Sequence, residues 1–142
     1  MTRVYFSVQE ANDLIKKIKP QVDKLFELNE QLHLLDNTKI EFDDDSTKSF
    51  LLEVELNKNF HEKNVELYTL LGDLIEQGCI VRDLDKMEIN FYSKHDKKEI
   101  LLCWKPSEEQ ILYWHYLGED PEKKKSVKQL REEKIDALKK LV

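Results

Sequence analysis

His115 is the residue of this 142-residue chain that is best suited to chemistry. An imidazole changes its charge near neutral pH, so it can act as an acid, a base or a metal ligand. Two acids, Glu108 and Glu119, lie in the same segment. Glu108 is two helical turns away, about 10 Å along a helix, and Gly118 is expected to end that helix before Glu119. A metal at His115 therefore needs further donors, for which the candidates are Asp83, Glu88, His95 and His61.

Trp114 and His115 admit three interpretations. They pack on a sheet with the ring N–H bonded to a backbone carbonyl, they take part in metal or acid–base chemistry, or they form a patch that binds a partner. A dense aromatic cluster is typical of a core, and its exposed members are typical of an interface. The cluster comprises Trp104, Tyr113, Trp114 and Tyr116.

Three polar residues form a second group of candidates in the middle of a predicted helix. Asn57, His61 and Asn64 occupy positions that continue the apolar stripe of that helix. If the chain reverses direction near residue 41, they face Gln21 and the Pro20 kink. They then either bond to one another and fix the register of two helices, or form a small polar pocket that binds an ion or ligand.

Two charged clusters give weaker signals. Residues 43–45 are three adjacent aspartates that could bind a cation, but they lack the spacing of an EF-hand and fit a solvated loop better. A basic stripe near the C-terminus is explained by a solvated helix face, so nucleic-acid binding is not expected. The stripe comprises Lys123, Lys124, Lys125, Lys128 and Arg131.

Composition favours a helix-rich protein with one domain over residues 1–142. Lys and Arg number 23 and Asp and Glu 29, a net charge of −6 that opposes broad binding to nucleic acids or anionic membranes. Charged residues make up 37% of the chain, with only three glycines and three prolines, which favours long solvated helices. No segment is typical of a signal peptide or a membrane span, so a cytoplasmic protein is expected.

Two long helices are predicted, over residues 7–35 and 47–77. Ser7 and Glu10 form a capping box, and Gly78 is expected to end the second helix. Pro20 should kink the first helix rather than break it, because the apolar stripe continues in phase. The two helices should pack as an antiparallel hairpin.

A three-stranded antiparallel meander is predicted to follow. Its strands are 79–84, 87–93 and 99–104, with two-residue turns at 85–86 and 96–97. This register aligns Ile80, Phe91 and Leu102 on an apolar face that also carries Trp104 and covers the hairpin. Cys79 and Cys103 then share the other face about 10 Å apart, too far for a disulfide, so two free thiols are expected.

Two further helices complete the predicted α+β fold. Ser107 and Gln110 form a capping box for a short helix over 107–117. Asp120 caps a C-terminal helical arm over 120–142, with Pro121 at its first position. The arm docks on the body, pairs with another subunit or frays.

Several segments resemble an uncharacterised prokaryotic family, domain of unknown function 2203. The resemblance covers residues 4–118 and is carried by residues 5–12 with Pro20, 78–84, 89–91, 101–104 and 114–115. Met87 and Tyr92 stand where the family pattern has a glycine and a proline, and a lysine-rich tail follows Asp120. Because the family has no established reaction, the resemblance implies an architecture and a cytoplasmic location only.

The leading functional hypothesis is a non-enzymatic interaction or scaffold protein that forms a homodimer through its long helices. A hairpin of this length leaves parts of each apolar stripe without intramolecular cover. The alternative is a metal-dependent hydrolase or a metal- or ligand-binding protein that uses His115 or His61. No cofactor is predicted, and a divalent metal belongs to this alternative alone.

Overall fold

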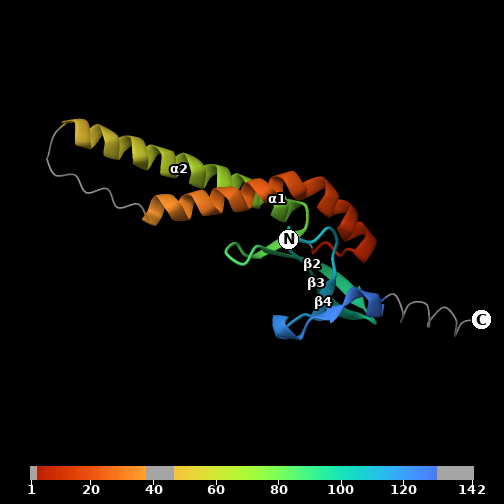
Figure 1. Cartoon of the computed structure of the whole chain (residues 1–142). Helices are drawn as coiled ribbons and strands as arrows, with labels where there is room; N and C mark the ends of the chain where they lie inside the picture. Colours follow the sequence, from red (N-terminus) through yellow and green to blue (C-terminus); the bar gives the residue numbers. More distant parts are fainter. Residues whose placement is uncertain (1–2, 38–46, 131–142) are drawn as a thin grey trace, which may run out of the picture.

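The computed structural model describes residues 3–37 and 47–130. Two long helices precede a five-stranded antiparallel sheet in which each strand pairs with its neighbour in the chain (Figure 1). The elements are α1 (Val8–Asn37), α2 (Thr47–Glu76), β1 (Cys79–Asp83), β2 (Glu88–His95), β3 (Lys98–Trp104), β4 (Tyr113–Tyr116), the 3-10 helix η1 (Pro121–Lys123) and β5 (Lys125–Ser126). The α+β class is confirmed, with five strands instead of three. None of the helices in the described ranges is long and apolar enough to cross a membrane.

Helix α1 begins at the predicted capping box. The Ser7 hydroxyl accepts from the Glu10 backbone N–H at 3.1 Å, and the Glu10 carboxylate accepts from the Ser7 N–H at 3.2 Å. Pro20 lies inside α1 without ending it. Figure 1 shows the helix changing direction between its red first turns and its orange second half, as expected for a proline kink.

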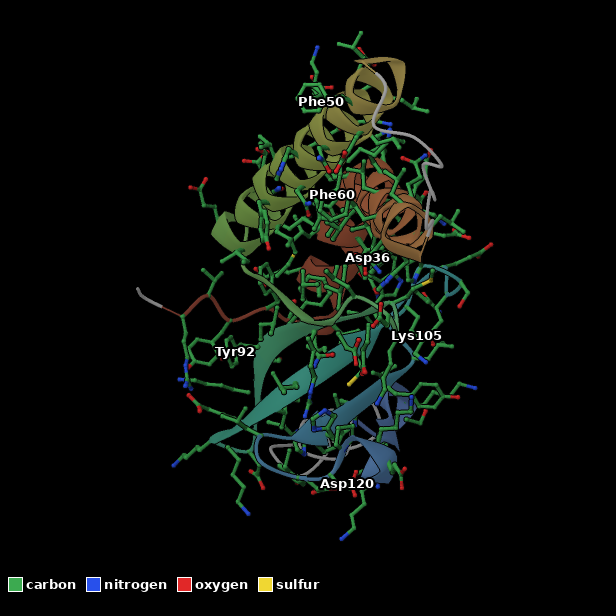
Figure 2. All side chains as sticks on the ribbon, turned by 90° about the vertical axis from the view of Figure 1, so that its left-hand side faces the viewer. Asp36, Phe50, Phe60, Tyr92, Lys105 and Asp120 are labelled. Atoms are coloured by element: carbon green, nitrogen blue, oxygen red, sulfur yellow. The ribbon has the colours of Figure 1, made fainter. Side chains whose placement is uncertain are left out.

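The two helices pack side by side, but their register differs from the expected one. Gln77 donates to Gln21 at 3.2 Å and Lys63 to Gln31 at 3.1 Å, so the paired positions are centred on residues 47–49 and not near residue 41. The stripe of α1 is covered by the later turns of α2 and by the sheet. The first turns of α2 therefore extend beyond the end of α1, and Phe50 projects from them (Figures 1 and 2).

The turn between β2 and β3 confirms the predicted register. Asp96 and Lys97 form the two-residue turn, with φ of 53° and 66°. A hairpin turn with both central residues at positive φ matches the strand twist, even though neither residue here is a glycine. Phe91 lies opposite Leu102, as predicted.

The turn between β1 and β2 is longer than predicted, and a bulge next to it shifts the rest of β1 by one residue. Asp83 pairs with Glu88 and its carboxylate accepts from the backbone N–H groups of Asp85 and Lys86, so four residues form the turn. A bulge lies between Val81 and Asp83. Cys79 is consequently opposite Phe91, and the prediction that Ile80 faces the helices was wrong.

No helix forms over residues 107–117, contrary to the prediction. Residues 105–112 form a loop, and Tyr113–Tyr116 pair with β3 as strand β4. The loop is fixed because the Trp104 indole N–H donates to the Glu108 carbonyl and the Ile111 N–H to the Asn12 side chain, both at 2.8 Å. These tertiary bonds outweigh the local capping signal.

The predicted C-terminal arm is only partly described. Asp120 does cap η1, accepting from the Glu122 N–H at 3.0 Å, but this helix has three residues. Strand β5 follows, and helical residues resume at Val127. The rest of the predicted arm lies outside the described residues.

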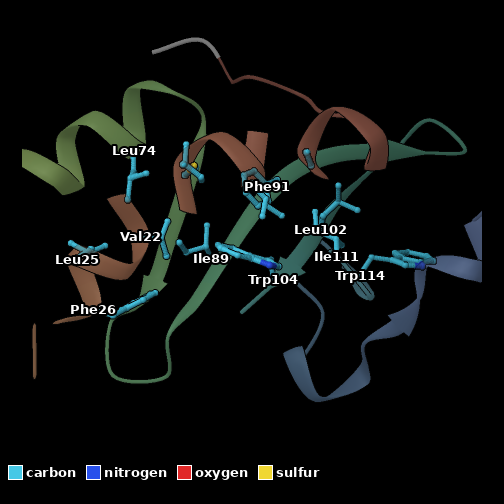
Figure 3. Close-up of a cluster of buried hydrophobic side chains, with 14 of the residues drawn as sticks. Val22, Leu25, Phe26, Leu74, Ile89, Phe91, Leu102, Trp104, Ile111 and Trp114 are labelled. Atoms are coloured by element: carbon cyan, nitrogen blue, oxygen red, sulfur yellow. The ribbon is translucent and has the colours of Figure 1, made fainter. Parts of the chain in front are cut away.

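The core lies between α1 and one face of the sheet, next to the end of α2 (Figure 3). Phe91 and Trp104 have no exposed surface there. The residues drawn with them come from the helices (Val22, Leu25, Phe26, Leu74) and from the sheet and loop (Ile89, Leu102, Ile111, Trp114). The central structural prediction, that paired helices cover the apolar face of the sheet, is thus confirmed.

Candidate functional site

His115 lies in β4 on the face of the sheet that points away from the helices. It is opposite Leu101, and side chains alternate along β3, so these two share a face with Cys103. We call this the outer face: it comprises Ile80, Glu88, Asn90, Tyr92, Leu101, Cys103, Tyr113 and His115. Sequence reasoning placed His115 on a short helix, and that placement was wrong.

The chemical state of the His115 ring follows from one contact. Its Nδ1 lies 2.9 Å from the Tyr116 carbonyl oxygen. A carbonyl oxygen only accepts hydrogen bonds, so Nδ1 carries the proton and Nε2 carries the lone pair. The residue is 1% exposed, and Nε2 has no hydrogen-bond partner in the part of the chain that the structure describes. The ring is thus held as a buried acceptor.

Asn90 is the second unusual residue of the outer face. It is 0% exposed, and neither its side-chain nitrogen nor its oxygen has a hydrogen-bond partner within residues 3–37 and 47–130. Leaving a buried polar group unpaired costs about 1–3 kcal/mol. Together with His115 Nε2, this small face holds three buried polar atoms without a partner.

Cys103 is opposite Asn90 and supplies a buried thiol. Burial, followed by the nearby Glu88 carboxylate, raises its pKa to about 12, while the charges of Lys124 and Arg82 act in the opposite direction. The thiol is therefore neutral at physiological pH and a poor nucleophile.

Cys79 is a separate buried thiol on the helix-facing side. It lies opposite Phe91, and burial raises its pKa to about 12 as well. The predicted pair of free cysteines is confirmed. They occupy opposite faces, because the bulge in β1 reverses the direction of Cys79.

Three further candidates stabilise the fold: Trp104, Trp114 and Glu108. Both tryptophans belong to the buried core, and the Trp114 indole donates to the Ser126 carbonyl at 3.2 Å. The Glu108 carboxylate accepts from the Lys105 N–H at 3.0 Å and so closes its own loop. Glu108 also lines a polar cleft of about 690 Å³ between α1 and this loop. None of these residues lies on the outer face with His115.

Asn57, His61 and Asn64 do not form the expected polar cluster between the helices. Asn57 and His61 are exposed, and Asn64 donates to the Phe60 carbonyl of its own helix at 3.2 Å. The side of α2 that packs against α1 carries Lys63, Leu67 and Leu74, and Asn57 and His61 lie beside it in solvent. His61 lies on α2, whereas His115 lies on the face of the sheet that points away from the helices. The two histidines are therefore not neighbours.

The described residues hold no group of three or more His, Cys, Asp or Glu side chains that could bind a metal ion. Asp83, one of the proposed donors, is occupied in the β1–β2 turn. His95 contacts the Trp114 ring at a centroid distance of 5.5 Å. The three aspartates at 43–45 lie outside the described ranges.

Sequence reasoning missed Asn90 and Arg82. An asparagine on the outer face of a strand is ordinarily solvated, so it gives no signal by itself. The available signal was its neighbours, because the same face carries Leu101 and Cys103 and is thus partly apolar. Arg82 lies in the β1 bulge, and the turn residues did not indicate that bulge.

These observations define the class of this molecule: an α+β protein in which a long helical hairpin covers one face of an antiparallel meander. The sequence pattern of one family matches residues 4–136, and the chain therefore belongs to DUF2203, a family described as an uncharacterized conserved protein. Neither a curated protein nor a solved structure matches the chain.

Proposed function

We propose that this protein is a non-enzymatic interaction protein that pairs with a second copy of itself through α2. The observation that carries the proposal is one face of α2 that has no charged residue and is exposed along its whole length. We call it the α2 face: it comprises Phe50, Val54, Asn57, His61, Val65, Tyr68, Gly72 and Ile75.

The spacing of these residues makes them one continuous surface. They recur at steps of three and four, which places them on one side of a helix. Val65 is 67% exposed and Tyr68 is 68% exposed, in the middle of the strip. Large apolar side chains aligned in this way mark a protein-interaction site, because covering them removes apolar area from water.

The size of the α2 face fits a weak specific pair. Its length is about 39 Å at 1.5 Å per residue, and a width of about 12 Å gives roughly 470 Å² on each copy. Two copies together bury roughly 900 Å², near the lower limit of specific interfaces. We therefore expect association in the micromolar range.

A second copy is favoured over another partner because the strip is complementary to itself. Two uncharged faces can meet without burying an ion. The acids of α2, such as Glu62 and Glu66, lie beside the strip and stay in solvent. Asn57 and His61 can bond across the contact and fix its register, as polar residues do between helices.

Light scattering on the purified chain tests the proposal. We expect a dimer at roughly 50 µM and dissociation on dilution. Val65→Glu places a charge at the centre of the strip and should give a monomer with unchanged helix content by circular dichroism. Glu66→Lys, one residue along and outside the strip, is the control and should remain dimeric. A monomeric wild-type protein at this concentration would refute the proposal.

A further inference from the structure

We propose that the outer face of the sheet binds a small molecule through an oxyanion, a carboxylate or a phosphoryl group, held by Arg82, Asn90 and Lys124. This site is independent of the α2 face. It lies on another element and needs no second copy.

The pairing of the strands places Asn90 in a row across the sheet, with Arg82 and Lys124 near its two ends. Asn90 on β2 is opposite Cys103 on β3, and Cys103 is opposite Tyr113 on β4. Directly opposed residues of antiparallel strands have side chains on the same face about 5 Å apart. Ile80 is the β1 residue opposite Asn90. Arg82 lies two residues further along β1, in the bulge, and Lys124 lies beside the β4 end of the row, 5.1 Å from the centre of the Tyr113 ring.

At the base of this row, the Asn90 side chain has a hydrogen-bond donor without an acceptor among the described residues. The Asn90 amide is fully buried, and its N–H₂ group has no acceptor. A ligand oxygen would satisfy it and remove the penalty of the unpaired group. His115 Nε2, on the same face, is an unpaired acceptor for a ligand hydroxyl.

The two cations lie near opposite ends of this row. Arg82 and Lys124 are exposed, and among the residues that the structure describes neither forms a salt bridge. The charges of Arg82 and Lys124 both act to lower the pKa of the Cys103 thiol, so both act at the middle of the row. A bulge such as the one at Arg82 typically redirects a side chain toward a site.

This donor set selects an oxyanion. Two cations and an amide N–H₂ offer hydrogen bonds and positive charge, while the Glu88 carboxylate also lies close to the Cys103 thiol. Glu88 can accept from a hydroxyl or amino group elsewhere on the ligand. The Arg82 and Lys124 side chains are long and flexible, so they can move to admit a ligand and then close over its anion.

Nuclear magnetic resonance titration of the full-length chain tests the inference, with inorganic phosphate and acetate as separate probes at constant ionic strength. We expect saturable shifts of the Asn90 side-chain amide and of the backbone amides of β2 and β3. The double variant Arg82→Gln, Lys124→Gln should weaken binding about tenfold or more, as for the loss of hydrogen bonds to a charged group. The control is Lys86→Gln, Lys105→Gln, which removes the same charge from exposed positions outside the row and should bind normally.

Each outcome supports or overturns the inferred oxyanion site. Binding of phosphate alone identifies a phosphoryl group, and binding of acetate alone identifies a carboxylate. The inference is overturned if neither probe gives a saturable shift, or if the double variant and the control bind equally. Asn90→Leu adds a second check, because it should abolish binding while keeping the fold. If that variant does not fold, the comparison of the two charge variants still decides.

Discussion

The α2 face and the outer face of the sheet are both incomplete surfaces, in opposite ways. The α2 face exposes apolar side chains to water, with Tyr68 at its middle. The outer face buries polar atoms of Asn90 and His115 without partners. An exposed apolar strip is completed by a partner that covers area, whereas a buried polar group is completed by a hydrogen bond. This difference is why we propose a second copy of the chain for the α2 face and a small molecule for the outer face.

The largest expected effect comes from placing the same charge on each surface. Leu101→Asp puts a carboxylate at a buried position of the outer face, and we expect a loss of about 3–5 kcal/mol in unfolding free energy. Val65→Asp on the α2 face should change the unfolding free energy of the monomer by about 0.5 kcal/mol or less. Urea unfolding measures both. Similar losses in the two variants would contradict the contrast between a buried and an exposed surface.

The second effect is a dependence of stability on pH that belongs to the outer face. The pKa of Cys103 is about 12 in the folded chain, above its ordinary value of 9.0. The stabilisation from keeping the thiol neutral is therefore complete below pH 9 and is lost as the pH rises toward 12. The expected slope in this window is about 1.4 kcal/mol per pH unit.

Cys103→Ala isolates this contribution, because lysines and tyrosines titrate in the same range in both proteins. The variant should show a shallower fall in unfolding free energy above pH 9 than the wild type. Identical slopes would mean that the thiol is already solvated in the folded chain.

The smallest effect concerns the α2 face. Nothing lies within 4 Å of a Cβ added at Gly72, so Gly72→Ala should stabilise the monomer by about 0.5–1 kcal/mol through helix propensity. Gly78→Ala should instead destabilise, since its φ is +99° and the new Cβ would lie 2.8 Å from the Phe6 ring. Thermal unfolding in the Val65→Glu background separates this effect from association. Destabilisation by Gly72→Ala would show that the strip is already covered.

Local signals predicted most of the fold. The Ser7–Glu10 capping box, the Gly78 cap and the apolar alternation around Phe91 each depend on neighbours within a few residues. The errors occurred where distant contacts override such signals. Ser107 and Gln110 satisfy a helix-start pattern, yet the bond from Ile111 to Asn12 holds the segment as a loop and strand.

The candidate site was predicted less well, because it depends on pairing and not on spacing. His115 was identified by its chemistry, but its neighbours became known only when β4 was placed beside β3. A bulge of one residue at Arg82 and a shift of the hairpin register moved the other candidates to new surfaces. Periodicity alone does not determine either displacement.

The order of the strands also dictates an order of folding. Each strand pairs with its neighbour in the chain, so the meander is built from contacts between segments that are close in sequence. The contact between α1 and the loop after β3 joins residues that are far apart in the sequence, since Asn12 and Ile111 are 99 residues apart. Closing short loops loses less entropy, so we expect the meander to form early and α1 to dock late. Before α1 docks, the Trp104 indole is exposed to water. We therefore expect its fluorescence to report the final stage of refolding.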